Sequence, residues 1–423
     1  QENRRDYKFE LKYFQYLPLF FTEIFLSQKY NNINNFISEL NIFLNKSNLD
    51  NNTNIIEFKE DEITKLAYWM ATGSGKTLIM HINYWQILKY SQEGWDNILL
   101  ITPNEGMSNQ HYNEMKLSGI PCKLYDGNPD NIHTKDKEVL ILDIYKLTGE
   151  KKGRGKTLDI KSFGAKNLVF IDEGHKGQKS EEQKWKKLRE ELGKDGFIFE
   201  YSATFGQVIK NNVELLEEYS KAILFDYSYK YFYSDGYGKD FHVFNLKEDY
   251  YSNKYEEMLL TASLLSYYEK IISYDNHQEK LKEYNIEKPL WIFVGSKVSG
   301  FGLQSDIIKI LDFLSKILEN NKILEYNVKK ILTGDSGLLG SNERDIFDKK
   351  FQLLDYTPSL INDIYDKVFR NKGQLEAYIL KKADGEIALK VSNSDNYFGV
   401  INIGDTASLK TLIEKLGIKV LND

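Results

Sequence analysis

Short runs of apolar residues alternate with helical stretches over the first half of the chain. Four of these runs have the length of a buried strand: Ile98–Thr102, Val139–Asp143, Leu168–Ile171 and Phe197–Tyr201. Runs that are apolar throughout are typical of parallel strands covered on both faces. The pattern therefore predicts an α/β fold, with a parallel sheet and helices on both of its faces.

Apolar and aromatic positions are dense in residues 7–45, which predicts one or two helices that pack on a larger body. Asparagine-rich turns at 31–35 and 50–54 punctuate this segment. Beyond it, Asp61 is expected to cap a helix that carries the chain toward a glycine-rich run.

The second half begins with a segment rich in Tyr and Phe, 222–245, which is expected to be extended connecting structure. A long helix over about 253–285 leads to an apolar strand, Leu290–Val294, that opens a second α/β unit. Further helices are expected near 305–319 and 360–370, a strand or helix edge near 328–333, and strands at 375–380, 386–391 and 398–403.

These elements predict four segments. They are an N-terminal helical segment at 1–60, a first domain at 61–245, a helical connector at 246–288 and a second domain at 289–423. The second domain is expected to be incomplete.

Composition narrows the class of protein. The 423 residues carry a net charge of −6, which argues against a uniformly basic nucleic-acid coat but leaves room for a local basic groove. The single cysteine excludes an intramolecular disulfide framework and fits a reducing compartment. No apolar run has membrane-spanning length, so we expect a cytoplasmic protein without a membrane partner. The one basic loop, 151–156, is best interpreted as a solvated turn.

The glycine-rich run Met70–Thr77 predicts a phosphate-binding loop. Glycines allow a tight curl that turns successive N–H groups toward phosphate oxygens, and the following helix presents its N-terminus to the same anion. Lys76 is the residue expected to reach the β- and γ-phosphates of ATP, and Thr77 to hold Mg²⁺. The nucleotide would be cradled by Thr72, Gly73, Ser74, Gly75, Lys76 and Thr77. Met70 stands where the general pattern has glycine.

Two carboxylates follow the apolar strand at 168–171. Asp172 is predicted to hold the magnesium and Glu173 to orient or deprotonate the water that attacks the γ-phosphate. Downstream, the hydroxyls of Ser202 and Thr204 are predicted to bond to His175 and so tie the ATP site to the next element. The alternative for His175 is an inert surface histidine.

Polar residues after two other strands suit contacts to a nucleic-acid backbone. Thr102, Asn104 and Gln110 surround a strand-to-helix turn, for which a plain turn is the alternative. Ser296 and Lys297 have the same character after the strand expected at 290–294.

In this order, the motifs resemble those of superfamily-two helicases and translocases of the DEAD/DEAH type. The glycine-rich run matches motif I, Thr102 to Asn104 motif Ia, Asp172 to His175 motif II, Ser202 to Thr204 motif III, and Phe293 to Lys297 motif IV. The sequence around these motifs, including Phe199 to Tyr201 and Trp291, looks closest to the restriction subunit of type III restriction–modification systems and related defence helicases.

This resemblance implies two RecA-like domains that hydrolyse ATP with Mg²⁺ and move on DNA, with a modification methyltransferase as a possible partner subunit. It assigns Lys76 and Glu173 to catalysis together with Asp172, and Ser202 and Thr204 to coupling. Gln15 could match the glutamine that reads adenine in the family, although core packing is the favoured interpretation.

The chain departs from the family at Gly174, where Ala or Pro is common, and it shows no motif V or VI. In the family, the second domain should supply an arginine finger, and no such segment is found here. We therefore expect the chain to bind ATP but to hydrolyse it slowly, because an arginine finger contributes about a thousandfold or more to turnover. Two other functions remain open: an ATP-gated platform for DNA or a partner, and a P-loop kinase. Stripping of a third DNA strand excludes the platform, and an ATPase indifferent to DNA favours the kinase.

Overall fold

The chain divides into two compact units, Gln1–Asp240 and Phe241–Asp423, in the computed structural model. The structure describes residues 10–91, 94–128, 131–147, 160–173, 188, 191–209, 213–239, 253–284, 286–294, 306–340, 343–380, 386–402 and 406–422.

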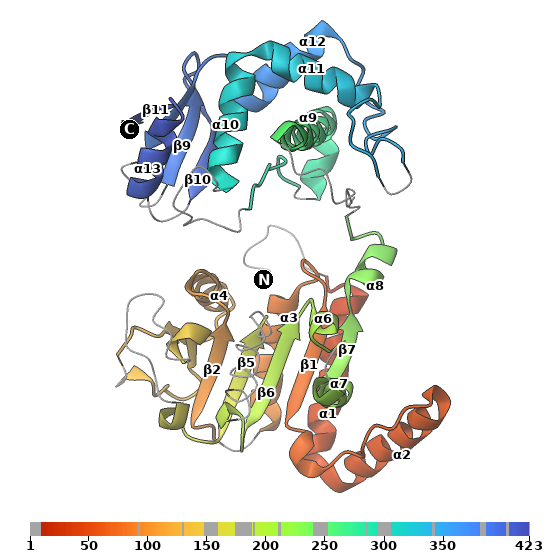
Figure 1. The fold of residues 1–423 in the computed structure, drawn as a ribbon. Coiled ribbons are helices and arrows are strands. Elements are labelled where there is room, and N and C mark those ends of the chain that lie inside the picture. The colour runs from red at the N-terminus through yellow and green to blue at the C-terminus, as the bar shows by residue number, and fades with distance from the viewer. Residues whose placement is uncertain are drawn as a thin grey trace. The chain divides into compact units, whose positions relative to one another are not determined.

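The first unit is built on a seven-stranded sheet in the order β3-β4-β2-β5-β6-β1-β7, in which every neighbouring pair is parallel (Figure 1). Its strands are β1 (Lys65–Met70), β2 (Asn97–Thr102), β3 (Cys122–Leu124), β4 (Val139–Asp143), β5 (Asn167–Asp172), β6 (Phe197–Ser202) and β7 (Ile223–Tyr227). Its helices are α1 (Tyr13–Asn31), α2 (Ile33–Asn51), α3 (Lys76–Tyr90), α4 (Glu105–Leu117), α6 (Phe205–Ile209), α7 (Val213–Ala222) and α8 (Tyr229–Ser234).

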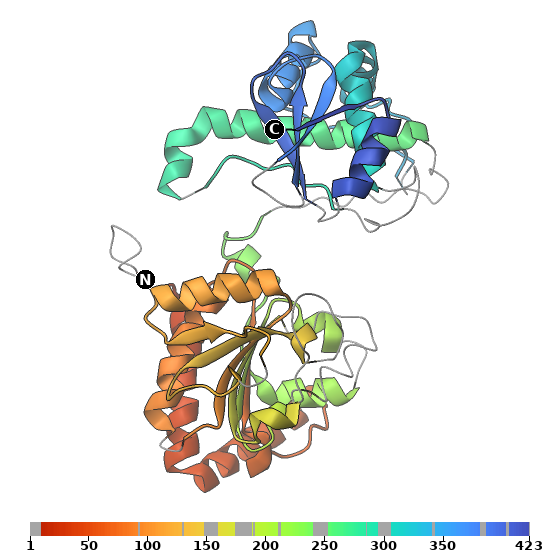
Figure 2. The same cartoon turned by 90° about the vertical axis from the view of Figure 1, so that its left-hand side faces the viewer.

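Helices cover both faces of this sheet, as Figure 2 shows from the side. On one face α1 and α3 share a core with inward positions such as Tyr68, Phe170 and Phe199. On the other face lie α6 and α7. Strands β2, β4, β5 and β6 are buried along their whole length, which explains why the sequence shows continuous rather than alternating apolar runs. The predicted α/β class is confirmed.

The helix expected after Asp61 is wrong. Residues 65–70 form β1, which lies in the sheet between β6 and β7 and leads straight into the glycine-rich loop. Tyr68 and Trp69 are aromatic residues of the kind enriched in strands, and Leu66 to Tyr68 are fully buried. The segment at 222–245 was also misassigned as connecting structure: its described residues contain β7 and α8.

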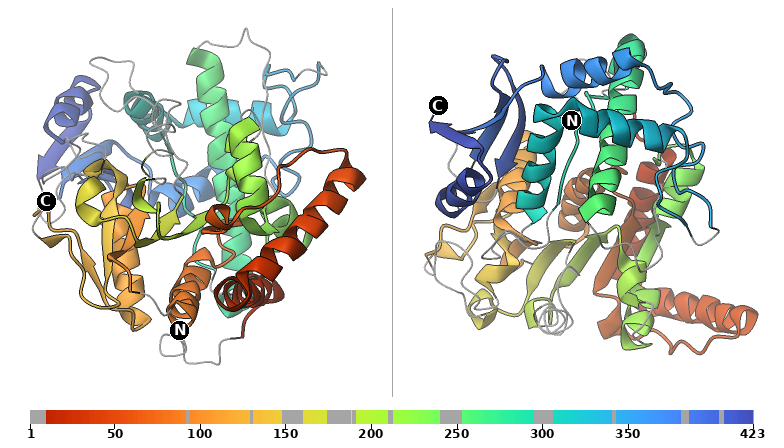
Figure 3. Two further views of the ribbon diagram at one scale, coloured as in Figure 1. Left: turned by 90° about the horizontal axis from the view of Figure 1, so that it is seen from below. Right: turned by 45° about the horizontal axis from the view of Figure 1, so that its top comes forward.

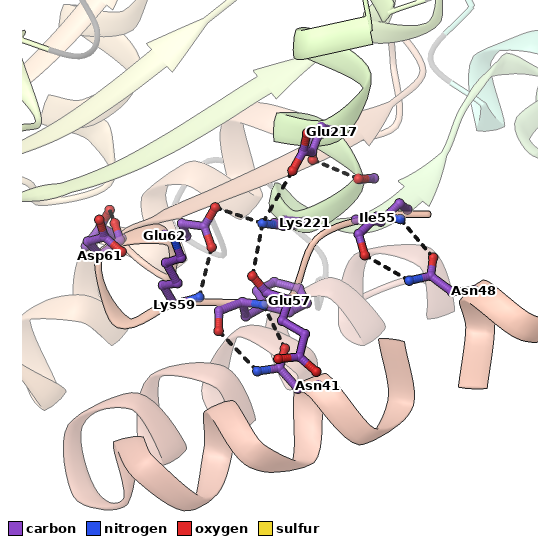
Figure 4. A network of polar contacts seen from close by, with 12 residues as sticks. Asn41, Asn48, Ile55, Glu57, Lys59, Asp61, Glu62, Glu217 and Lys221 are labelled. Carbon is purple, nitrogen blue, oxygen red and sulfur yellow. Dashed lines mark hydrogen bonds and ion pairs between the residues drawn. The ribbon is translucent and has the colours of Figure 1, made fainter. Parts of the chain in front are cut away.

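Helix α2 is bound to the segment that precedes β1 by side-chain amides (Figure 4). Asn41 donates to the carbonyl of Phe58 (3.1 Å) and accepts from its N–H (2.7 Å), and Asn48 makes the same pair of bonds with Ile55 (2.8 and 3.0 Å). On the other side, the ammonium of Lys221 on α7 contacts the carbonyl of Glu57 (3.3 Å) and the carboxylate of Glu62 (2.7 Å). These contacts hold residues 53–59, which form no helix or strand.

We predict that Asn41→Ala lowers the free energy of unfolding by about 1–2 kcal/mol, since two hydrogen bonds to partly buried backbone are lost. Urea denaturation measures the change. Asn45→Ala is the matched control on the same helix, because Asn45 donates to the exposed carboxylate of Glu57 rather than to backbone. Equal losses for the two variants would show that the backbone bonds of Asn41 add nothing.

The second unit has a four-stranded sheet in the order β10-β9-β8-β11, antiparallel except for the parallel pair β8–β11. Helices α10 and α13 lie beside this sheet (Figure 3). The elements are α9 (Asn253–Glu283), α10 (Asp306–Glu319), α11 (Asn321–Leu332), α12 (Pro358–Ile364), α13 (Thr406–Lys415), β8 (Leu375–Ile379), β9 (Glu386–Val391), β10 (Tyr397–Asn402) and β11 (Lys419–Asn422). The helices predicted near 253–285, 305–319 and 360–370 and the three predicted strands are all present, and 328–333 lies at the end of α11.

The strand predicted at Leu290–Val294 does not form. The described residues 286–294 include no helix or strand, and Leu290 and Val294 are 78% and 91% exposed. Trp291 instead attaches the segment to α9, because its indole N–H donates to Ser263 (3.0 Å) and its ring stacks on Tyr267. The apolar run was therefore an incomplete guide, since an aromatic anchor on α9 holds this backbone.

Candidate nucleotide site

The glycine-rich loop connects the carboxyl end of β1 to the N-terminus of α3. Gly73 and Gly75 have φ of +88° and +99°, a region in which glycine alone is unstrained. The Ser74 side chain is fully buried and donates to the carbonyl of Ala71 (2.7 Å), which closes the curl from inside. The loop therefore has the tight curl that a phosphate cradle requires.

The side chain of Lys76 lies inside the curl and faces β5. Its ammonium is 3.2 Å from Glu173 Oε1 and 3.3 Å from the carbonyl of Met70. Glu173 Oε2 in turn accepts from the hydroxyl of Ser202 on β6 (3.2 Å). Three residues that the sequence predicted for one site, from motifs I, II and III, thus meet in a continuous chain of contacts.

Glu173 is held in an unusual backbone conformation directly after β5. Its φ is +52°, in the left-handed region that residues with a Cβ seldom adopt. Its N–H donates to the carbonyl of Tyr201 (2.9 Å), and only 10% of its side chain is exposed. Such conformations persist where surrounding contacts impose them and cluster at functional sites. Here the conformation aims the carboxylate at Lys76.

Asp172 has a partner that sequence reasoning missed. Its Oδ2 lies 2.9 Å from Nε2 of His111 on α4, and both side chains are buried. One signal was available: Ser108, His111 and Met115 recur at helical spacing and form the buried stripe of α4. The sequence analysis singled out the exposed neighbour Gln110 instead.

The residues fit a magnesium nucleotide. Lys76 is a mostly buried cation beside the glycine-rich loop, while Thr77 in the first turn of α3 and Asp172 have oxygen atoms that could serve as metal ligands. Magnesium is usually bound by one or two carboxylates together with substrate phosphates and water, rather than by an all-protein cage. Among the described residues no group of three or more His, Cys, Asp or Glu side chains could hold a metal.

The predicted nucleic-acid residues at β2 and α4 divide into two kinds. Thr102 is fully buried, and its hydroxyl contacts the carbonyl of Asn104 (3.0 Å) and the hydroxyl of Ser108 (2.6 Å), so it shapes the turn. Asn104 and Gln110 are exposed, and Asn104 caps α4 by accepting from the N–H of Met107 (2.9 Å). Beside Thr102 in register lies Asp143, whose pKa is raised by burial.

The coupling residues are placed in part. Ser202 ends β6, and its hydroxyl also accepts from the N–H of Thr204 (3.0 Å). His175 lies outside the described residues, as do Ser296 and Lys297, so their predicted roles stay predictions.

Gln15 lies against the phosphate loop rather than in a distant core. From the first turn of α1 its amide donates to the carbonyl of Ser74 (3.1 Å), and a Cβ at Gly75 would come within 2.7 Å of that amide nitrogen. Next to it Phe14 stacks on Tyr227 at 4.4 Å between ring centroids. Nearby, the hydroxyls of Tyr13 and Tyr227 both bond to Asp235, and these bonds lower the pKa of Asp235. Sequence distance had hidden this contact, since Gln15 and Ser74 are 59 positions apart in the chain.

Comparison with known proteins agrees with the motifs. Residues 22–207 match the family model described as "Type III restriction enzyme, res subunit", so the predicted resemblance to that subunit is confirmed over this segment. No functionally curated protein matches the chain. The motif pattern and this match agree with each other over the first unit of the chain.

Solved structures with similarity to the chain include two helicases and one ATPase core. The UvsW helicase of bacteriophage T4 is 16% identical over 41% of this chain and 60% of its own (TM-score 0.27). The Hef helicase domain of Pyrococcus furiosus is 14% identical over 69% and 64% (TM-score 0.30). The SWI2/SNF2 ATPase core of Sulfolobus solfataricus, solved with double-stranded DNA, is 13% identical over 98% and 78% (TM-score 0.29). The chain thus spans less than two thirds of the length of the UvsW helicase and of the Hef helicase domain.

Proposed function

We propose that this chain is the ATP-driven motor of a DNA translocase or helicase. The observation that carries the proposal is the meeting of Lys76, Glu173 and Ser202 in one chain of contacts at the carboxyl edge of the parallel sheet. Ligands of open α/β sheets bind at this edge.

The residues would divide the work of ATP hydrolysis. The loop amides and Lys76 would bind the phosphates, and Lys76 would stabilise the charge that develops as the γ-phosphate leaves. Glu173 would orient the attacking water and accept its proton. Magnesium, held through Thr77 and Asp172, would neutralise phosphate charge when bound.

The Lys76–Glu173 ion pair gives this site two arrangements. Without nucleotide, the two charges neutralise each other at 3.2 Å in a mostly buried position. An incoming phosphate competes with Glu173 for Lys76 and would release the carboxylate to face water. Ser202 donates a hydrogen bond to the same carboxylate and accepts one from the N–H of Thr204. Release of Glu173 from Lys76 would therefore change the contacts at the end of β6 and at Thr204.

Several finer parts of the function belong to the same proposal. Exposed Asn104 and Gln110 would contact the DNA backbone, and the motor would serve a restriction–modification or antiphage defence system in the cytoplasm, with a methyltransferase subunit as partner. Turnover by this chain alone would be slow. The resemblance of residues 22–207 to the res subunit supports the restriction–modification part of this proposal. No helix among the described residues is both long and apolar enough to span a bilayer.

The experiment that tests the proposal measures ATP hydrolysis with and without double-stranded DNA, together with displacement of a third strand from a triplex. We predict hydrolysis that rises several-fold with DNA and displacement that requires ATP. Stimulation without displacement would indicate an ATP-gated platform. Hydrolysis unaffected by DNA would contradict the motor and favour a small-molecule phosphotransferase.

A further inference from the structure

The buried face of α4 reaches the magnesium carboxylate through one side chain. Asn104 and Ser108 fix the first turn of the helix, and His111, one turn later on the same stripe, meets Asp172 of β5 at 2.9 Å. The side chains of His111 and Asp172 are only 5% and 9% exposed. A hydrogen bond to a buried carboxylate is stronger than one in water and is costly to lose.

The chemistry of the pair sets its direction. An ionised carboxylate only accepts hydrogen bonds, so Nε2 of His111 carries the proton and donates. The other ring nitrogen, Nδ1, is buried and has no hydrogen-bond partner in the described part of the chain. Asp172 is therefore the contact that accounts for a polar ring at a position where an apolar side chain would fill the space without an unsatisfied atom.

We propose that His111 is a positioning residue for Asp172 and sets how strongly the site binds magnesium. The inference rests on the proposed function, in which Asp172 holds the cation. The hydrogen bond from His111 occupies Oδ2 of Asp172, fixes the rotamer of this carboxylate and so determines which of its oxygens is presented to the metal. Hydrogen-bond partners of metal ligands act in this way, and their replacement typically costs 10- to 100-fold in metal affinity.

The test is the equilibrium affinity of the whole chain for a fluorescent ATP analogue, measured in EDTA and in Mg²⁺. The ratio of the two dissociation constants reports the contribution of the metal. For His111→Leu we expect this ratio to fall by about 10- to 100-fold, with the affinity in EDTA unchanged. His111→Gln places an amide N–H within reach of the position of Nε2, so the ratio of dissociation constants should stay close to its wild-type value. The side chain of His111→Asn is one carbon shorter and cannot reach that position, so the ratio should fall as it does in His111→Leu.

Two controls separate positioning from folding. His81→Leu removes a buried histidine of α3 whose ring bonds to the hydroxyl of Ser118 (2.8 Å) and not to a carboxylate, and it should leave the ratio at its wild-type value. Thermal unfolding identifies any variant that fails to fold. If His111→Leu does not fold, the comparison of His111→Gln with His111→Asn still tests the positioning role.

A wild-type ratio in His111→Leu or in His111→Asn would overturn the positioning role while leaving the proposed function standing. Wild-type protein that binds no nucleotide in either buffer would overturn the proposed function and this inference together.

Discussion

Replacing Lys76 by alanine is expected to lower ATP hydrolysis by at least about a hundredfold and to weaken ATP binding. The variant loses the cation that the phosphates would contact, and it removes the ammonium that lies 3.2 Å from the buried Glu173 carboxylate. Removal of one group that stabilises transition-state charge typically costs about 10²–10³ in kcat. Steady-state phosphate release and equilibrium nucleotide binding measure the two effects.

Lys89→Ala is the matched control for this prediction. Lys89 lies on the same helix, α3, is 63% exposed and pairs with Glu23 at the far end of the helix from the loop. Its replacement should leave hydrolysis within about twofold of wild type, because exposed ion pairs contribute little. If Lys76→Ala kept wild-type affinity for ATP, the lysine would not belong to the nucleotide site.

Replacing Glu173 by glutamine should separate binding from chemistry. Glutamine keeps the shape of the side chain but cannot accept the proton of the attacking water, so we expect kcat to fall by about 10²–10⁴. ATP should bind as tightly as before or more tightly, since the neutral amide no longer competes with phosphate for Lys76. Single-turnover hydrolysis and nucleotide affinity measure the pair of effects.

The control for the second prediction is Glu39→Gln, an exposed glutamate of α2. It should change neither hydrolysis nor affinity. A Glu173→Gln variant that hydrolysed ATP at the wild-type rate would remove this residue from the chemistry, and one that lost ATP binding would assign it a structural role.

Much of the parallel sheet and of its functional edge could be predicted from the sequence. Buried parallel strands are apolar throughout, so β2, β4, β5 and β6 stood out, and the residues at their carboxyl ends meet because parallel strands end at one edge. Strand β1 was taken for a helix because a short apolar run has no period that separates the two.

What could not be predicted depends on contacts between residues remote in sequence. Gln15 reaches the phosphate loop from α1, and His111 reaches Asp172 from α4, across distances that no local pattern encodes. The left-handed conformation of Glu173 is likewise imposed by Tyr201, Ser202 and Lys76 rather than by its own preference. For Leu290–Val294 the apolar run was correctly noticed, but a tryptophan anchor on α9 replaced the expected strand partner.

A structure determined with a non-hydrolysable ATP analogue and Mg²⁺ tests the central claim most directly. The account predicts the γ-phosphate within hydrogen-bond distance of the Lys76 ammonium, a broken Lys76–Glu173 ion pair, and the cation beside Thr77 and Asp172. Nucleotide bound elsewhere, or bound here with the Lys76–Glu173 pair intact, would contradict it.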